Sequence, residues 1–117
     1  MKSPILSICI PNYGRPEFLA KNIEAIAKQN SSQIEIVITD DASPDNIKKI
    51  IVDFKKKYPK VNIRFKKHST NQGFDKNVLS VIRFARGKYC WLLSNDDQIL
   101  PKAISKITKV ITQNPDV

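Results

Sequence analysis

Two pairs of adjacent aspartates are the residues in this sequence most suited to chemistry. Asp40-Asp41 and Asp96-Asp97 each follow a short apolar run of the kind that forms a buried β-strand. Neighbouring carboxylates repel each other, so a positive partner is needed to keep both ionised. A hard divalent cation meets that need, because magnesium binds one or two carboxylates together with the phosphates of a substrate. Asp96-Asp97 is therefore a candidate metal and phosphate site, with a solvated helix-capping turn as the alternative.

Other side chains near the expected strand ends have both a functional and a plain structural interpretation. Asp41 or Ser43 could do no more than cap the next helix. Tyr13 offers a flat ring on which a nucleotide base could stack, or it simply covers the end of the sheet. The single histidine, His68, lies in a polar segment and is given no role. Three cations follow the turn at Gly73 and either contact phosphates or are solvated: Lys76, Arg83 and Arg86.

The elements that must position these residues alternate between apolar runs and helical patterns. Strands are predicted at residues 7–10, 34–39, 61–65 and 89–93, and the third of these is expected near a sheet edge. Helices are predicted to begin at about Pro16, Pro44, Phe74 and Pro101, and the third is expected to run from Phe74 to Ala85. This order predicts an α/β fold, a three-layer α/β/α arrangement with a mostly parallel sheet and right-handed crossovers.

The helix patterns carry more specific expectations. Ser43 is predicted to be an N-cap with Pro44 at the first helical position. Gly87 fits the C-terminal stop of the third helix. The residues expected on apolar helix faces recur at helical spacing: Phe18, Leu19, Ile23, Ile26 and Ala27; Ile47, Ile50, Ile51 and Phe54; Val78, Leu79, Ile82 and Ala85; Ile104, Ile107, Val110 and Ile111.

The carboxyl ends of the predicted strands select three clusters as the candidate site. Ligands of parallel α/β sheets bind outside the carboxyl ends of the strands. The residues placed there are Pro11-Asn12-Tyr13, Asp40-Asp41 and Asn95-Asp96-Asp97. We therefore expect these three segments to meet at one edge of the sheet.

Composition limits the class of protein. The chain has 117 residues, of which 41% are apolar, and this suits one domain with a core. No apolar stretch reaches 18 residues and no signal peptide is recognisable, so we expect a cytoplasmic protein. Cys9 and Cys90 lie in apolar runs and are expected to be reduced core residues rather than a disulfide.

The net charge of +9 is compatible with several classes of binding partner and does not choose among them. It suits nucleic acid, an anionic membrane surface or a phosphorylated ligand, or else it reflects solvated helix faces. No nucleic-acid-binding motif accompanies the lysines, so nucleic acid is not expected as a partner.

Four segments, in order, resemble the motifs of family 2 glycosyltransferases. Residues 7–16, Ser-Ile-Cys-Ile-Pro-Asn-Tyr-Gly-Arg-Pro, resemble the apolar strand, Pro and Tyr-Asn-Arg with which that family opens. Residues 35–43 resemble its second strand with Asp-Asp-Gly-Ser, and Asn71-Gln72-Gly73 with Asn77 resembles its Asn-x-Gly…Asn turn and helix. Residues 87–97 are similar to the strand carrying its Asp-x-Asp-type metal motif. Together the segments cover essentially the whole chain.

The resemblance implies a GT-A fold, a nucleoside-diphosphate sugar donor and a divalent metal, magnesium or manganese, on the diphosphate. By position, Tyr13 would stack on the base, the Pro11 backbone would contact it, and Asp41 would hydrogen-bond it. Asp96 would face the ribose or sugar, and Asp97 would bind the metal. The metal would neutralise charge on the departing diphosphate. The family inverts the anomeric carbon by direct attack of an acceptor hydroxyl, deprotonated by a carboxylate base.

The sequence departs from the family pattern at three positions and at its end. Gly14 stands where the family usually has Asn, Ala42 where it has Gly, and Asn95 where some members have an earlier acid. The family's acceptor site and catalytic base lie beyond position 117. The resemblance therefore implies that residues 1–117 are the N-terminal nucleotide-sugar-binding half of a truncated catalytic domain, with the acceptor-binding half absent. No residue is nominated as the base, and we expect these residues alone to transfer no sugar.

The leading hypothesis is a glycosyltransferase that acts in bacterial surface polysaccharide or glycolipid synthesis. It would take a UDP- or dTDP-linked sugar and a saccharide or lipid-linked acceptor, and its positive charge would favour the inner face of the membrane. A nucleotidyltransferase with a related sheet is one alternative, although such enzymes usually open with a Gly-rich loop and this segment has only Gly14. A non-enzymatic receiver-like signalling module is the other, although that class has its acidic pair after the first strand, where this chain has none.

Overall fold

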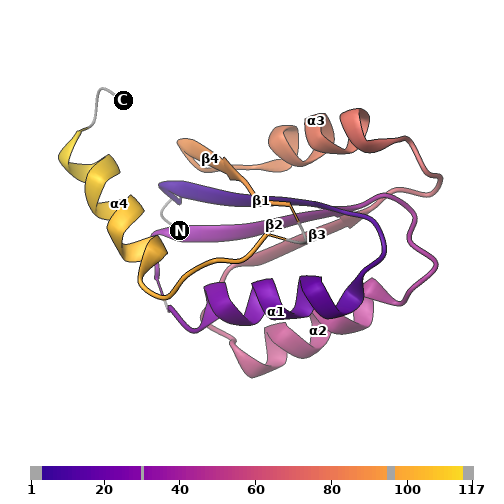
Figure 1. The fold of residues 1–117 in the computed structure, drawn as a ribbon, viewed down its shortest axis with the longest axis horizontal. Helices are drawn as coiled ribbons and strands as arrows, with labels where there is room; N and C mark the ends of the chain where they lie inside the picture. Colours follow the sequence, from indigo (N-terminus) through magenta and orange to yellow (C-terminus); the bar gives the residue numbers. More distant parts are fainter. Residues whose placement is uncertain (1–3, 30, 95–96, 115–117) are drawn as a thin grey trace.

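Four strands and four helices alternate along the chain, as the sequence predicts (Figure 1). The computed structural model describes residues 4–29, 31–94 and 97–114. In chain order the elements are β1 (Leu6–Asn12), α1 (Pro16–Ala27), β2 (Ile34–Asp40), α2 (Ile47–Lys57), β3 (Ile63–Lys67), α3 (Phe74–Phe84), β4 (Tyr89–Leu92) and α4 (Ala103–Gln113). None of the described helices combines the length and the apolar character that crossing a membrane requires.

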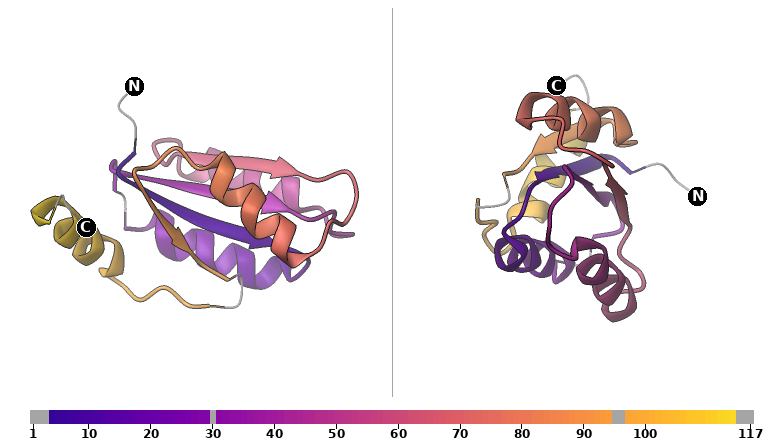
Figure 2. Two further views of the ribbon diagram at one scale, coloured as in Figure 1. Left: turned by 90° about the horizontal axis from the view of Figure 1, so that it is seen from above. Right: turned by 90° about the vertical axis from the view of Figure 1, so that its right-hand side faces the viewer.

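The strands form one parallel sheet in the order β3-β2-β1-β4. Helices α1 and α2 cover one face and α3 covers the other, while α4 lies beyond the amino ends of the strands (Figures 1 and 2). The predicted three-layer arrangement is therefore confirmed, with β3 at an edge as expected. The carboxyl ends of β1 and β2 lie side by side, because Asn12 is the register partner of Asp40.

The core lies mainly between the sheet and the α1–α2 layer. Strands β1 and β2 are buried along their whole length, and their isoleucines alternate toward α1 and α2. The opposite face has a smaller apolar cluster in which Cys9 and Val37 meet Val81 of α3. Leu19, Ile23 and Ile26 bury the predicted stripe of α1, with Pro16 at the start of that helix. Two central strands thus form a rigid platform whose carboxyl ends carry the candidate residues.

The buried polar side chains on the α3 face of the sheet have hydrogen-bond partners among the described residues. Glu35 is buried, and its carboxylate accepts from Ser7 Oγ, from Arg86 N at 2.6 Å and from Arg64 Nη1 at 3.1 Å. Burial by itself would raise the pKa of Glu35, but the bonds from Ser7, Arg86 and Arg64 outweigh it and hold the pKa below its ordinary value. The carboxylate therefore stays ionised inside the fold and ties β1, β3 and the end of α3 to β2.

Two helix boundaries differ from the predictions. Helix α2 begins at Ile47, and its N-cap is Asn46, whose side chain accepts from Lys49 N at 3.2 Å. Ser43 was the wrong choice because its hydroxyl is bonded to Asp40 and Gly14 instead. Gly87 is not a helix stop either, since α3 ends at Phe84 with Ala85 extended. A Cβ on Gly87 would lie 2.5 Å from Ser7 Oγ, so glycine is required there by the close approach of β1.

Burial also corrects several apolar predictions. The buried face of α3 differs from the predicted one, because Asn77 and Val81 are buried while Leu79 and Ile82 are exposed. Phe18 and Val110, also predicted on apolar faces, are exposed.

The two cysteines lie in different environments. Both are free, as predicted, but only Cys9 lies in the core, whereas Cys90 is exposed on β4. Burial, followed by the neighbouring Cys90, raises the pKa of the Cys9 thiol to about 12.

Candidate functional site

The carboxyl ends of β1 and β2 meet in a buried polar network centred on Asp40. Asp40 Oδ1 accepts from Asn12 Nδ2 at 2.9 Å and from the Ser43 hydroxyl, and Oδ2 accepts from Ser43 N at 3.0 Å. Asn12 and Asp40 are both fully buried. The Asp40 carboxylate is therefore occupied by the protein itself and fixes how the chain leaves both strands.

The same network fixes the loop that carries Tyr13. Gly14 N donates to Ser43 Oγ at 2.6 Å, so the loop after β1 is bound to the loop after β2. Gly14 and Arg15 both have left-handed backbones, with φ of 66° and 47°, and they turn the chain sharply into α1. Tyr13 precedes this turn and is 54% exposed. An aromatic ring is thus presented to solvent on an anchored backbone at the end of β1.

Pro11 lies buried in β1, opposite Thr39 of β2. Proline lacks an N–H and is found in sheets only where no ladder bond is needed. Pro11 meets this condition on the side of β1 that faces β4, because the pairing of β1 with β4 ends at Cys9 and Leu92. Past Cys9, β1 has no described strand on that side, and Pro11 sits at this open edge next to Tyr13.

Asp41 binds the loop in front of α3. The side chain is 3% exposed, and its two oxygens accept from Gln72 N at 2.8 Å and Gly73 N at 2.9 Å. Its carbonyl accepts from Asn71 Nδ2 at 3.2 Å. Asp41 is therefore no cap of α2, one of the interpretations open from the sequence, but an anchor that joins the end of β2 to the start of α3.

Two further residues belong to this end of the sheet. Asn77 Oδ1 accepts from Thr39 Oγ1 at 2.8 Å and from His68 Nε2 at 3.2 Å, while Asn77 Nδ2 donates to the carbonyl of Asn12 at 3.3 Å. His68 is 7% exposed and the sequence analysis gave it no role. The sequence signal for Asn77 was its position four residues before Val81, which places both on the same face of the helix. Alternation along β3 was the signal for His68, since Arg64, Lys66 and His68 share one face.

Of the third predicted cluster, the structure describes only Asp97. Asp97 is exposed, and its Oδ2 accepts from Ser94 N at 3.0 Å. It lines a hollow of about 380 Å³ with Phe18, Lys21 and Asn22 of α1. In the described part of the chain, no hydrogen bond or ion pair joins Asp97 to Tyr13 or Asp41. Asn95 and Asp96 lie outside the described residues, so the structure does not place the expected sugar contact of Asp96.

The donor set at Asp97 suits one kind of metal site. Among the described residues, no group of three or more His, Cys, Asp or Glu side chains could hold a metal ion. Asp97 supplies a solvent-accessible hard carboxylate, which is one protein ligand and not a cage. Such a site fits magnesium or manganese that takes most of its ligands from phosphate oxygens and water.

Comparison with known proteins identifies the class of the fold. The chain superposes on the crystal structure of residues 1–349 of TarS from S. aureus in complex with UDP, with a TM-score of 0.82 and 22% identity over 93% of this chain and 32% of that one. It also superposes on the mannosyltransferase PcManGT from Pyrobaculum calidifontis in complex with GDP-Man and Mn²⁺, with a TM-score of 0.81 and 16% identity over 95% and 33%. The fold is that of the GT-A transferases.

Sequence comparison gives the family. The model of glycosyl transferase family 2 matches residues 7–117, and the chain belongs to this family. The chain is 30% identical to the abequosyltransferase RfbV of Salmonella typhimurium over 97% of its own length and 34% of the relative. It is 29% identical to a β-1,3-glucosyltransferase of Campylobacter jejuni named for a GalNAc(5)-diNAcBac-PP-undecaprenol substrate, over 89% and 33%. The chain thus spans about a third of these relatives. The family match supersedes the nucleotidyltransferase and receiver alternatives.

Proposed function

We propose that these residues form the nucleotide-sugar-binding part of a glycosyltransferase that transfers a sugar to an acceptor hydroxyl with inversion. The donor would be a UDP- or dTDP-linked sugar. The enzyme would act in the synthesis of a bacterial surface polysaccharide or glycolipid. Family membership supports sugar transfer, the UDP complex of TarS supports the donor class, and the undecaprenol-linked substrate in the name of the Campylobacter relative supports a lipid-linked acceptor. The acceptor site and the catalytic base would come from outside residues 1–117.

The observation that carries the proposal is the pre-built end of β1 and β2. An exposed Tyr13 ring sits on a backbone held by Ser43, next to Pro11 at an open strand edge. A base stacked on Tyr13 would meet a surface that does not have to be ordered first, which lowers the entropic cost of binding. Pro11 would contact the base through its carbonyl, and Asp41 would accept a hydrogen bond from it through the lone pairs that Gln72 and Gly73 leave available.

The phosphate end of the donor would extend toward Asp97, with Asp96 toward the ribose or sugar. Magnesium or manganese bound there would supply charge neutralisation for the departing diphosphate. Asp97 would contribute one carboxylate oxygen, while its bond from Ser94 N holds the side chain in place. Because the site has a single described carboxylate, metal and diphosphate would bind together better than either alone.

Binding of nucleoside diphosphates to the full-length protein tests the proposal. Calorimetry with UDP, dTDP, GDP and CDP, with and without manganese, should show that one or both of the first two bind most tightly. Tyr13→Ala should weaken that binding roughly tenfold, because stacking of a base on an aromatic ring contributes about 1–3 kcal/mol. Val110→Ala is the control, since Val110 is an exposed apolar residue of α4, which lies beyond the amino ends of the strands (Figure 1). Failure of all four nucleotides to bind, with or without metal, would rule out the donor site.

A further inference from the structure

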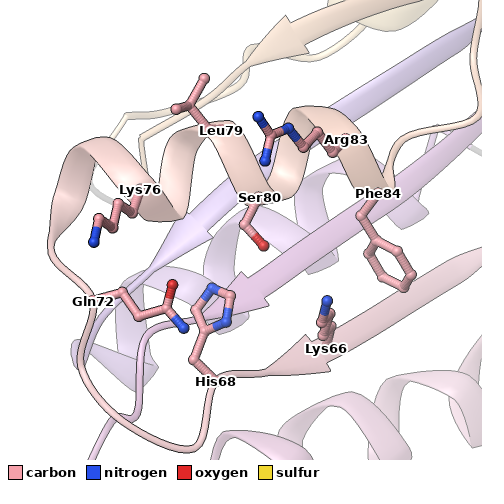
Figure 3. Close-up of a pocket in the computed structure, with 8 residues that line it drawn as sticks. All are labelled: Lys66, His68, Gln72, Lys76, Leu79, Ser80, Arg83 and Phe84. Carbon is pink, nitrogen blue, oxygen red and sulfur yellow. The ribbon is translucent and has the colours of Figure 1, made fainter.

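A second hollow lies between α3 and the edge strand β3, on the face of the sheet opposite α1 and α2 (Figure 3). It has a volume of about 570 Å³, and we call it the α3–β3 groove. Helix α3 packs mainly against β1 and β2 and meets β3 where Phe84 lies against Arg64, while Lys66 of β3 stays exposed. The groove is lined mainly by Lys66, His68, Gln72, Lys76, Arg83 and Phe84.

The charges that face this groove are all positive. Lys66 comes from β3, and Lys76 and Arg83 lie two turns apart on α3 (Figure 3). Within the described ranges no carboxylate lines the groove, and none forms an ion pair with any of these three cations. Like charges around one hollow repel each other, and an anion bound between them would relieve that repulsion.

Arg64 on the same face of β3 provides an internal contrast. Its guanidinium meets Glu35 at 3.1 Å and lies over the Phe84 ring at 4.1 Å from the centroid. The fold therefore neutralises the cation that is covered and leaves the next one along the strand, Lys66, facing open space. This pattern differs from a solvated face on which acidic and basic residues alternate.

Two polar residues that line the groove are hydrogen-bonded to neighbouring parts of the fold. His68 is nearly buried, and its ring is held by the bond from Nε2 to Asn77 Oδ1. Gln72 is anchored through its backbone N–H to Asp41. Phe84 closes the other end with an apolar ring. Three exposed cations around one hollow suit a compact, multiply charged anion, because a guanidinium and two ammonium groups can contact several oxygens at once.

We propose that the α3–β3 groove binds a phosphate-bearing anion at a site separate from the strand-end donor site. The phosphate belongs either to a free phosphorylated small molecule or to the headgroup of an acidic lipid, and the recognition chemistry is the same for both. This inference goes beyond the proposed function and does not depend on it. The residues that hold the anion are Lys66, Lys76 and Arg83.

Binding of inorganic pyrophosphate to the full-length protein tests the site. EDTA in the buffer keeps divalent metal away from Asp97, so pyrophosphate is not retained there. The triple variant Lys66→Gln, Lys76→Gln, Arg83→Gln should bind at least about tenfold more weakly than the wild type, because each charge-assisted bond is stronger than a neutral one. The matched control is Lys48→Gln, Lys55→Gln, Lys56→Gln on α2, which removes the same number of charges from exposed positions.

Vesicles distinguish the two sources of phosphate. Co-sedimentation with phosphatidylglycerol vesicles, compared with phosphatidylcholine vesicles, should be lost in the groove variant and kept in the α2 control if the anion is a lipid headgroup. Binding of pyrophosphate without vesicle binding identifies a free ligand. Equal loss in both triple variants, or no binding of either probe by the wild type, overturns the proposal. Calorimetry with UDP and manganese should be unchanged in the groove variant, so failure here is separate from failure of the donor site.

Discussion

The two ends of the candidate site are built in opposite ways. At the carboxyl ends of β1 and β2, Asp40 and Asp41 are buried and every carboxylate oxygen accepts a hydrogen bond from the protein. After β4, Asp97 is exposed, and its carboxylate has one described hydrogen bond, from the nearby Ser94 N. The difference indicates that folding alone orders the part of the site that is expected to meet the base. The part expected to meet phosphate presents an exposed carboxylate, which metal and substrate would complete under the proposed function.

Removing the Asp40 side chain should destabilise the carboxyl ends of β1 and β2 more than any other substitution considered below. Asp40→Ala leaves Asn12 Nδ2, Ser43 N and the Ser43 hydroxyl without their buried acceptor. We expect a loss of about 3 kcal/mol in the free energy of unfolding, measured by urea denaturation. Asp53→Ala, on the exposed side of α2, is the control and should change stability by less than about 0.5 kcal/mol. Equal effects of the two substitutions would mean that the buried network contributes no stability.

Glu35 tests whether a buried carboxylate elsewhere in the sheet behaves in the same way. Because its pKa is lowered in the folded state, its contribution is present above the ordinary value near 4.5 and is lost as pH falls through the folded pKa. Glu35→Gln should cost about 2 kcal/mol at pH 7. Unfolding measured between pH 7 and pH 3 should show a smaller acid-induced loss in the variant than in the wild type. Parallel profiles for the two proteins would contradict this assignment.

Asp41→Asn should separate the anchoring role of Asp41 from its charge. An amide keeps one acceptor oxygen but replaces the other by a donor, so it cannot serve both Gln72 N and Gly73 N. We expect a loss of about 1.5 kcal/mol, with faster hydrogen exchange at the backbone of residues 72 and 73. Asp53→Asn is the matched control. Unchanged exchange in the loop would show that Asp41 does not hold it.

Ala42 should give the smallest effect, with the opposite sign. It has a φ of 61°, in the left-handed region that disfavours any side chain, and glycine is the family residue at this position. Ala42→Gly should stabilise the protein by about 0.5 kcal/mol, since relief of strain exceeds the added chain entropy. Ala20→Gly within α1 should instead destabilise it by up to about 1 kcal/mol. Destabilisation in both variants would argue against strain at Ala42.

The order of elements and the site's general position were predictable, because both follow from patterns along the chain. Alternating strand and helix periods determine a parallel sheet, and the register of Asn12 with Asp40 brings the first two clusters together as expected. Motif resemblance predicted the family, which the family match confirms. The site roles given to Pro11, Tyr13, Asp41, Asp96 and Asp97 remain predictions.

What the sequence could not reveal is which polar groups find each other across the sheet. Ser43 was predicted to be a helix cap. Its hydroxyl instead accepts from Gly14 N and donates to the buried Asp40, which would otherwise lose hydrogen bonds in a place shielded from water. Asn77 takes a buried position in α3 because Thr39 and His68 need its amide oxygen, and this rotates the helix so that Leu79 is exposed. Such choices depend on partners distant in sequence, which neither helical spacing nor capping preference contains.

Manganese-dependent binding of UDP to Asp97→Asn tests the contrast between the two ends most directly. The wild-type protein should bind UDP more tightly with manganese than with EDTA. The variant should lose that gain, by about tenfold or more, while its metal-free affinity for UDP and its melting temperature stay unchanged. Asp53→Asn should behave as the wild type in all three measurements. A full manganese-dependent gain in Asp97→Asn would contradict the account, because the open end of the site would then not be the metal end.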